Sequence, residues 1–123
     1  MSKVTQILWM SEPAEHNYPS AISYLSLHLE PDKAERIVKA LREAPMSEFK
    51  ARDIFRASGL PLLGISSAKI KRNHEKIEEG KSLSPLLLVR SGHGNPLVVA
   101  DGYHRMCSVY TYDEDALIPC KIV

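Results

Sequence analysis

The chain has 123 residues, of which 44% are hydrophobic and 25% are charged, and these values are ordinary for a globular protein. This length fits a single domain, residues 1–123, that buries a core without disulfide or metal staples. The formal net charge of +1 gives no overall field of the kind that marks a nucleic-acid or membrane binder.

Residues 1–45 are expected to form a helical N-terminal extension. They contain neither an apolar signal-peptide core nor an apolar span of about 20 residues, which predicts a cytoplasmic protein with no membrane partner. Pro19 suits the first turn of a helix. The residues expected on the inner face of that helix are Ala21, Tyr24, Leu25, His28 and Leu29.

A second helix is expected near Asp32, which together with Glu35 resembles a capping box, and Pro45 should end it. Apolar residues recur along this helix at i, i+3, i+4 and i+7, namely Ala34, Ile37, Val38 and Leu41. We expect the apolar stripes of both helices to be packing surfaces. They either cover the rest of the fold or form the surface of a homodimer, and the sequence leaves both arrangements open.

The middle of the chain is expected to alternate short elements with loops. Residues 49–54 predict a short strand that runs into a turn of helix ending near Gly59, and residues 60–64 predict a packed loop. A polar helix is expected over residues 67–79, with Gly80 at its C-terminal cap. Because that helix carries few apolar residues, most of its surface should face water or a ligand.

Three apolar segments predict strands. Residues 86–89 and 97–100 are short apolar runs separated by a loop rich in glycine, which favours an antiparallel hairpin of buried strands. Apolar side chains alternate over residues 118–122, where Pro119 favours an edge position or the start of the strand. Since strands and helices mix without regular βαβ alternation, we expect an α+β fold.

The two cysteines, Cys107 and Cys120, have no Cys-x-x-Cys spacing and are expected to be free thiols in a reducing compartment. No histidine has ligand-like spacing with them, so a structural zinc site is not expected. The best candidate for a functional site is the junction that follows the second predicted strand.

That junction, residues 101–105, has the parts of an anion-binding site. A helix start leaves several backbone N–H groups unpaired and carries about half a positive charge. Gly102 allows another group to approach the backbone closely. His104 and Arg105 add side-chain donors, and a guanidinium can bind two phosphate oxygens at once. Together these features predict an anion cradle.

Asp101 leaves a second interpretation of the same junction open. As the N-cap residue it would satisfy the amides itself and repel an anion, unless a metal such as Mg²⁺ lies between them. In the simplest case Asp101 only caps the helix, and His104 and Arg105 are solvent-facing residues of the surface.

Residues 100–105, Ala-Asp-Gly-Tyr-His-Arg, resemble the signature turn of the ParB/sulfiredoxin superfamily. Sulfiredoxins carry Gly-Gly-Cys-His-Arg there, and the related free serine kinases carry Asp-Gly-His-His-Arg. Residues 68–77 resemble the sulfiredoxin helix that contacts nucleotide phosphates, and residues 84–89 and 118–123 resemble strands of that fold. The resemblance covers residues 47–123 and implies a ParB/sulfiredoxin-like core, a small mixed sheet packed with helices, after the two N-terminal helices.

The resemblance also implies roles for individual residues. His104 and Arg105 match the phosphate-binding His-Arg pair, and Lys69 matches the lysine that contacts phosphate. Arg72 and Lys76 occupy positions where sulfiredoxins use Ser and Thr for the same purpose. Because these three helix positions are spaced i, i+3 and i+7, one face would present all three cations. The alternative is a solvated face whose cations are balanced by the neighbouring glutamates of the helix.

Departures from the family pattern narrow the implied function. Gly102 and Tyr103 complete the predicted phosphate-binding turn, but Tyr103 replaces the cysteine that sulfiredoxin chemistry needs. Cys107 lies about one turn further along, on the presumed inner face, and is not expected to substitute. The arginine-rich box and helix-turn-helix of the CTP-binding partition proteins are missing. The motif is nearest to the free serine kinases, whose carboxylate base the sequence does not place.

The sequence therefore predicts a nucleotide- or phosphate-binding protein, a non-catalytic module, with a nucleoside di- or triphosphate and Mg²⁺ as the expected ligands. The alternative is a nucleotide-dependent phosphotransferase, in which Asp101 holds Mg²⁺ or assists proton transfer and His104 acts beside it on the phosphates. DNA is a weaker candidate partner, because basic residues over 69–81 alternate with acidic ones and no reading helix is evident.

Overall fold

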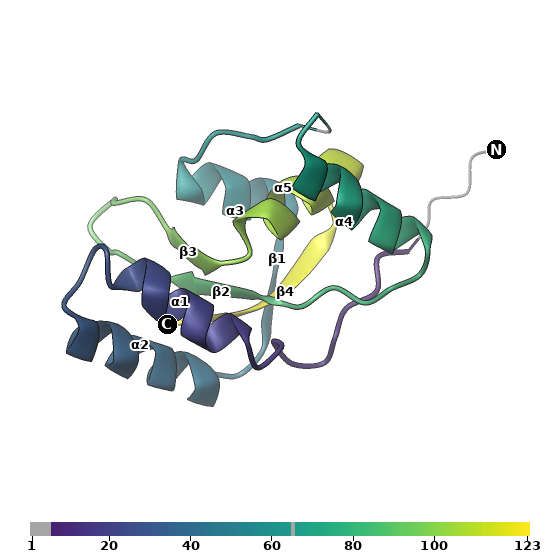
Figure 1. Cartoon of the computed structure of the whole chain (residues 1–123). Helices are drawn as coiled ribbons and strands as arrows, with labels where there is room; N and C mark the ends of the chain where they lie inside the picture. Colours follow the sequence, from purple (N-terminus) through teal and green to yellow (C-terminus); the bar gives the residue numbers. More distant parts are fainter. Residues whose placement is uncertain (1–5, 65) are drawn as a thin grey trace.

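The computed structural model describes residues 6–64 and 66–123. Within these residues the chain forms five helices and one four-stranded mixed sheet, which confirms the expected α+β class (Figure 1). In chain order the elements are α1 (Asn17–Leu25), α2 (Pro31–Glu43), β1 (Ser47–Lys50), α3 (Ala51–Ser58), α4 (Ala68–Glu78), β2 (Leu86–Val89), β3 (Val98–Asp101), α5 (Tyr103–Tyr112) and β4 (Leu117–Ile122). None of the helices described is long and apolar enough to cross a membrane.

The strands lie in the order β1-β4-β2-β3. β4 pairs antiparallel with β1 and parallel with β2, whereas β2 and β3 form the expected antiparallel hairpin. The last strand is therefore an interior strand, and the edge position that Pro119 suggested is wrong. β4 pairs with β2 only from Cys120 onward, so Pro119 lies just before the stretch with neighbours on both sides. Pro119 is the third residue of β4 and not its start, but it has a paired strand only on the β1 side, so β2 needs no N–H from it.

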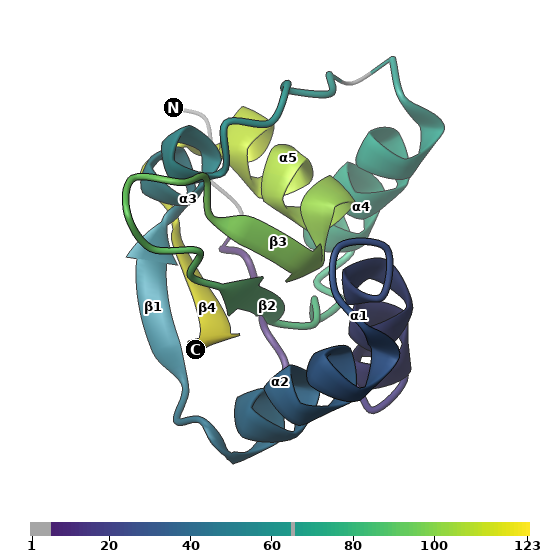
Figure 2. The same ribbon diagram turned by 90° about the vertical axis from the view of Figure 1, so that its left-hand side faces the viewer.

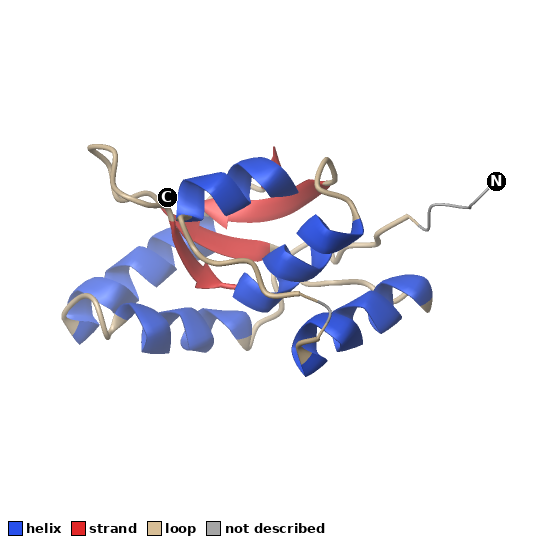
Figure 3. Ribbon diagram, turned by 90° about the horizontal axis from the view of Figure 1, so that it is seen from above, coloured by secondary structure: helices blue, strands red, loops and turns tan. Residues whose placement is uncertain are grey.

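Helices cover both faces of the sheet. α1 and α2 pack together against one face, and α3, α4 and α5 lie on the other (Figure 2, Figure 3). Side chains of β2 alternate between the two cores: Leu86 and Leu88 belong to the core beside α3, α4 and α5, and Leu87 to the core beside α1 and α2. This two-sided burial explains why residues 86–89 are apolar at every position.

The N-terminal helices thus cover the second face of the sheet, which is one of the two arrangements that the sequence left open. α2 buries the expected stripe at Ala34, Val38 and Leu41. Its first turn differs from expectation, because Pro31 already begins the helix and Glu30 is the N-cap residue. Asp32 lies inside the first turn and makes no capping hydrogen bond, so the expected capping box is wrong.

α1 buries only part of the expected face: Ala21 and Leu25 are buried as expected, but Tyr24 and His28 are not. Its buried apolar residues are Tyr18, Ala21 and Leu25. The helix begins two residues before Pro19 and ends at Leu25, so His28 lies beyond it. Tyr24 and His28 are exposed, with ring centroids 5.1 Å apart. The placement of these two residues on the inner face was therefore wrong.

The N-terminal segment, residues 6–16, is attached to the loop between α4 and β2. The Met10 N–H donates to the carbonyl of Leu83 at 2.8 Å, and the Ala14 N–H donates to Ser84 Oγ at 2.9 Å. These bonds join positions about 70 residues apart in the chain. They hold the segment beside the start of α5, where the candidate site lies.

Lys121 generates a prediction about stability. This residue is 5% exposed, and its Nζ donates to the Arg42 carbonyl at 2.6 Å and lies 3.4 Å from Glu12 Oε2. Lys121→Ala should lower the free energy of unfolding by about 1–3 kcal/mol, because it removes a charged donor and leaves space beside β4. Urea unfolding measures the change.

Glu12→Gln is the matched control for Lys121. The Glu12 side chain is 64% exposed, so its loss should change the free energy of unfolding by no more than about 0.5 kcal/mol. Equal, small effects of both substitutions would show that the buried ammonium of Lys121 does not stabilise the fold.

Candidate anion-binding site

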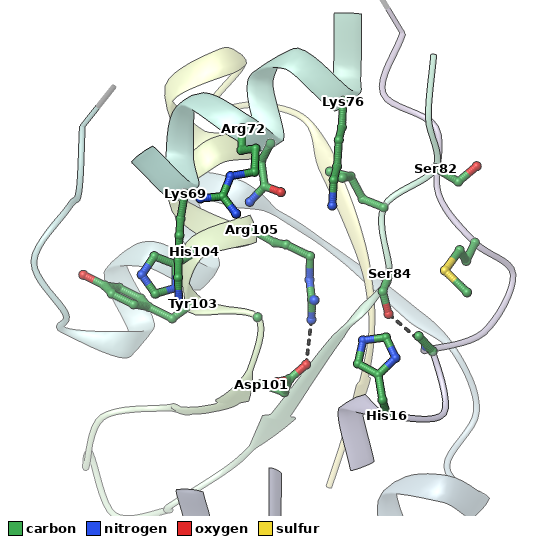
Figure 4. A pocket seen from close by; sticks show the side chains of 15 residues that line it. His16, Lys69, Arg72, Lys76, Ser82, Ser84, Asp101, Tyr103, His104 and Arg105 are labelled. Carbon is green, nitrogen blue, oxygen red and sulfur yellow. Dashed lines mark hydrogen bonds and ion pairs between the residues drawn. The ribbon is translucent and has the colours of Figure 1, made fainter. Parts of the chain in front are cut away.

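One pocket gathers every residue that the sequence marked as a candidate. It has a volume of about 410 Å³ and lies between α4, the start of α5 and the N-terminal segment (Figure 4). The predicted residues that line it are Lys69, Arg72, Lys76, Asp101, Gly102, Tyr103, His104 and Arg105. They meet because α4 packs beside α5. The ligand that these residues bind stays a prediction, but the fold does bring all eight side chains or backbone positions to one pocket.

Gly102 makes the junction between β3 and α5 possible. Its φ of 106° lies in the region that side chains disfavour, and a Cβ there would stand 2.8 Å from both Arg105 Nη2 and Leu86 Cγ. Gly102 is the N-cap residue of α5, and no side chain caps the helix. The proposed cap at Asp101 is therefore wrong, because Asp101 is the last residue of β3. Among the residues that the structure describes, no side chain accepts a hydrogen bond from the first amides of α5.

Asp101 is instead paired with Arg105. Arg105 Nη2 donates to Asp101 Oδ2 at 2.8 Å, and the side chains are only 19% and 17% exposed, respectively. Arg105 is thus mostly buried, and its expected position as a solvent-facing residue is wrong. The Nε of Arg105 is buried and has no partner within the described structure. The pair fixes the guanidinium at the pocket wall and leaves one of its donors unsatisfied.

Lys69, Arg72 and Lys76 form a row of cations along one face of α4, here called the cation row. All three are exposed, and their side chains extend into the pocket (Figure 4). None of the ion pairs within residues 6–64 and 66–123 involves a member of the row; Glu79 pairs with Lys81 instead. The alternative of a solvated face, with Glu75, Glu78 and Glu79 nearby, is consistent with the exposure of these side chains, but none of those glutamates forms an ion pair with the row in the described part of the chain.

His104 lines the pocket next to the cation row. Burial lowers the pKa of its imidazole, and the positive charge of Lys69 lowers that pKa further. Both causes favour the neutral ring, which has one donor and one acceptor nitrogen. An anion beside the ring would oppose both causes by stabilising the charged form.

Tyr103 connects α5 to the loop over residues 60–64. Its hydroxyl donates to the carbonyl of Pro61, across 42 positions of the chain. Burial raises the pKa of the phenol, and the neighbouring Cys107 raises that pKa further. Tyr103 therefore stays a protonated donor that holds the loop. Cys107 itself is fully buried on the inner face of α5, as expected.

Some residues of the pocket were missed by the sequence analysis. They are Met10, Ala14, His16, Asn73, Ser82, Leu83 and Ser84. His16 and its neighbours come from the N-terminal segment, which no motif marks. Their position depends on backbone pairing between Met10 and Leu83, and such a contact between distant segments leaves no local pattern in the sequence.

The lining residues suit an anion better than a bare metal ion. Asp101 is the one carboxylate among the described lining residues, and it is already bonded to Arg105. Over the described part of the chain, no group of three or more His, Cys, Asp or Glu residues is placed to hold a metal. Mg²⁺ usually binds through one or two carboxylates together with substrate phosphates. Asp101 would fit Mg²⁺ only in that shared form.

A scan against protein-family models found no match, and searches of the curated proteins and of the solved structures found none. The resemblance to the ParB/sulfiredoxin superfamily therefore stays a prediction, carried by residues 47–123.

The lowered pKa of His104 predicts how stability depends on pH. The unfolded histidine titrates near pH 6.5, so the unfolded chain binds this proton first as the pH falls. The stability that the neutral ring contributes is complete above about pH 6.5 and is lost as the pH falls through the folded-state pKa. Between about pH 7.5 and pH 5, the Tm of His104→Gln should therefore fall less than that of the wild type.

Thermal unfolding over this pH range, with and without pyrophosphate, checks the expectation for His104. Pyrophosphate should reduce the wild-type loss, because a bound anion stabilises the imidazolium. Parallel pH curves for the wild type and His104→Gln would contradict the lowered pKa.

Asp101 provides a prediction about affinity. Asp101→Asn removes the carboxylate from the pocket and weakens the bond that holds Arg105, so it should tighten binding of metal-free pyrophosphate by about tenfold. Calorimetric titration measures this change. If Asp101 instead holds Mg²⁺, the same substitution should weaken binding of magnesium pyrophosphate. Unchanged affinity in both titrations would exclude Asp101 from either role.

Proposed function

We propose that this protein binds a nucleotide, or another compound with linked phosphates, in the pocket between α4 and α5. The observation that carries the proposal is the gathering of four cationic side chains around one uncapped helix start. These side chains are the cation row and Arg105. A helix start with free amides and adjacent cations is the arrangement that binds phosphate groups in many folds.

The length of the cation row supports linked phosphates over a single one. Lys69 and Lys76 are seven residues apart on α4, which corresponds to about 10 Å along the helix axis. A chain of two or three phosphates can follow such a row along its length, whereas one phosphate contacts both ends only if the two lysine side chains converge on it. Arg105 and the first amides of α5 then bind one phosphate, and Arg72 and Lys76 bind the next.

The resemblance to the ParB/sulfiredoxin superfamily supports the same ligand from the sequence. The phosphate-binding residues that it implies, among them Lys69, His104 and Arg105, all line this pocket. Mg²⁺ would accompany the phosphates and share Asp101 with Arg105. A cytoplasmic location and a homodimer are further predictions from the sequence that this proposal does not require.

A nucleotide-dependent phosphotransferase is the second candidate. The observation that favours it is the lowered pKa of His104, because a neutral imidazole can accept a proton from an attacking hydroxyl. Asp101 is less suited to that role while it is bonded to Arg105. Release of nucleoside diphosphate from the triphosphate, lost in His104→Gln, would select this candidate over a binding module.

Arg72 gives the sharpest test of the binding proposal. Its side chain is exposed and unpaired within the described structure, so Arg72→Ala should leave the fold intact. A hydrogen bond to a charged group contributes about 1.5–3 kcal/mol, so the affinity for ADP should fall by about ten- to a hundredfold. Arg105→Ala is less informative, because it also leaves the mostly buried carboxylate of Asp101 without its partner.

Lys71→Ala is the matched control, since Lys71 is exposed on the same helix but does not line the pocket. Its affinity for ADP should equal that of the wild type. Equal losses in the two variants, or a wild type that binds neither ADP nor pyrophosphate, would contradict the proposal. Binding of duplex DNA with a steep dependence on salt would support the weaker DNA alternative.

A further inference from the structure

A second pocket lies on the other side of the same turn. It has a volume of about 510 Å³ and shares residues 101–104 with the cationic pocket. Its remaining walls come from α1, the loop after α3 and the end of β3: Ser20, Tyr24, Leu60, Pro61, Val99 and Ala100. The turn at Gly102 therefore separates two cavities of ligand size.

The two pockets differ in charge. The first is surrounded by the cation row and Arg105, whereas the described residues that line the second include no lysine or arginine. The second pocket offers apolar surface from Leu60 and Pro61, and hydroxyl groups from Ser20 and Tyr24. Such a lining suits an uncharged organic group with a few polar atoms and does not suit a phosphate.

The cation row leads toward the second pocket. Lys69, at the first turn of α4, lies close enough to His104 for its charge to act on the imidazole, and His104 belongs to both linings. In Figure 4 the Lys69 side chain extends toward Tyr103 and His104, and Lys76 is at the far end of the row. A phosphate chain along the row therefore has one end at the wall that the pockets share.

The wall of the second pocket is held in place before any ligand binds. The bond from the Tyr103 hydroxyl to the Pro61 carbonyl fixes the loop against α5. α1, which carries Ser20 and Tyr24, is fixed by burial of Tyr18 and Leu25 against the sheet. Tyr24 keeps 39% of its surface exposed, which leaves its ring accessible.

We propose that the second pocket receives the uncharged organic part of a phosphate ester whose phosphates lie in the cationic pocket. This inference rests on the proposed function and narrows it: the ligand is a nucleoside polyphosphate and not an inorganic one. It also gives the N-terminal extension a function, because α1 supplies the wall that faces the nucleoside.

The test compares pyrophosphate with the four common nucleoside diphosphates in calorimetric titrations of the full chain. At least one nucleoside diphosphate should bind about tenfold more tightly than pyrophosphate, because its organic part buries apolar surface. Ser20→Trp should fill the second pocket, reduce that preference to none and leave the affinity for pyrophosphate unchanged. Ser23→Trp is the matched control, since Ser23 is exposed on the same helix and does not line the pocket.

Failure of this inference is distinguishable from failure of the proposed function. If the wild type binds pyrophosphate and every nucleoside diphosphate alike, the second pocket does not hold the nucleoside. The same conclusion follows if Ser20→Trp prefers the nucleoside diphosphate as strongly as the control Ser23→Trp does. If Ser20→Trp changes only the oligomeric state, measured by light scattering, the pocket is an interface between copies and the inference is wrong. A wild type that binds no phosphate compound overturns both.

Discussion

Gly102 joins β3 to α5 at a place where a side chain would collide with Arg105 and Leu86. Because the backbone turns there without a Cβ, α5 can begin directly after the strand. One helical turn later, the side chain of Arg105 forms an ion pair with Asp101. The resulting ion pair holds the guanidinium at the pocket wall, and the amides of the first turn stay uncapped. The arrangement of the candidate site depends on this turn more than on any single charged residue.

The layers of the fold determine what surrounds the turn. α4 packs beside α5 on one face of the sheet, so the cation row lines the same pocket as the turn at residues 101–105. α1 packs on the other face and approaches the same turn from the opposite side. A cationic pocket and a pocket without lysine or arginine among its described lining residues therefore share one short backbone stretch, because helices cover both faces of a small sheet.

The charge of the site differs from that of the whole chain. A net charge of +1 excludes a strong overall field, yet the cation row and Arg105 face a cavity with one carboxylate. The local field follows from the spacing of Lys69, Arg72 and Lys76 on one helical face, and neither Glu75 nor Glu78 of α4 lines the cavity. Pairing of Glu79 with Lys81, away from the row, leaves that field intact.

Local patterns in the sequence determined most elements of this protein. The stripe of α2, the polar helix α4, the hairpin of β2 and β3, and the break at Gly102 all follow from periodicity and turn chemistry over a few neighbouring residues. The i, i+3, i+7 spacing of the cation row is likewise a local property. The local spacing places the three cations on one face of α4. Only the packing of α4 against α5 brings that face to residues 101–105, so that the predicted site residues line one pocket.

Contacts between distant segments were decided by the tertiary structure alone. β4 is an interior strand because it pairs with β1 on one side and with β2 on the other. No local pattern in the sequence distinguishes that position from an edge. The link from Tyr103 to Pro61, across 42 positions of the chain, depended on how the loop packs. The N-terminal segment reached the site through backbone bonds to Leu83. Backbone hydrogen bonds carry no residue-specific signal, and an apolar pattern indicates that a residue is buried but not which segment covers it, so the sequence by itself could not place these groups.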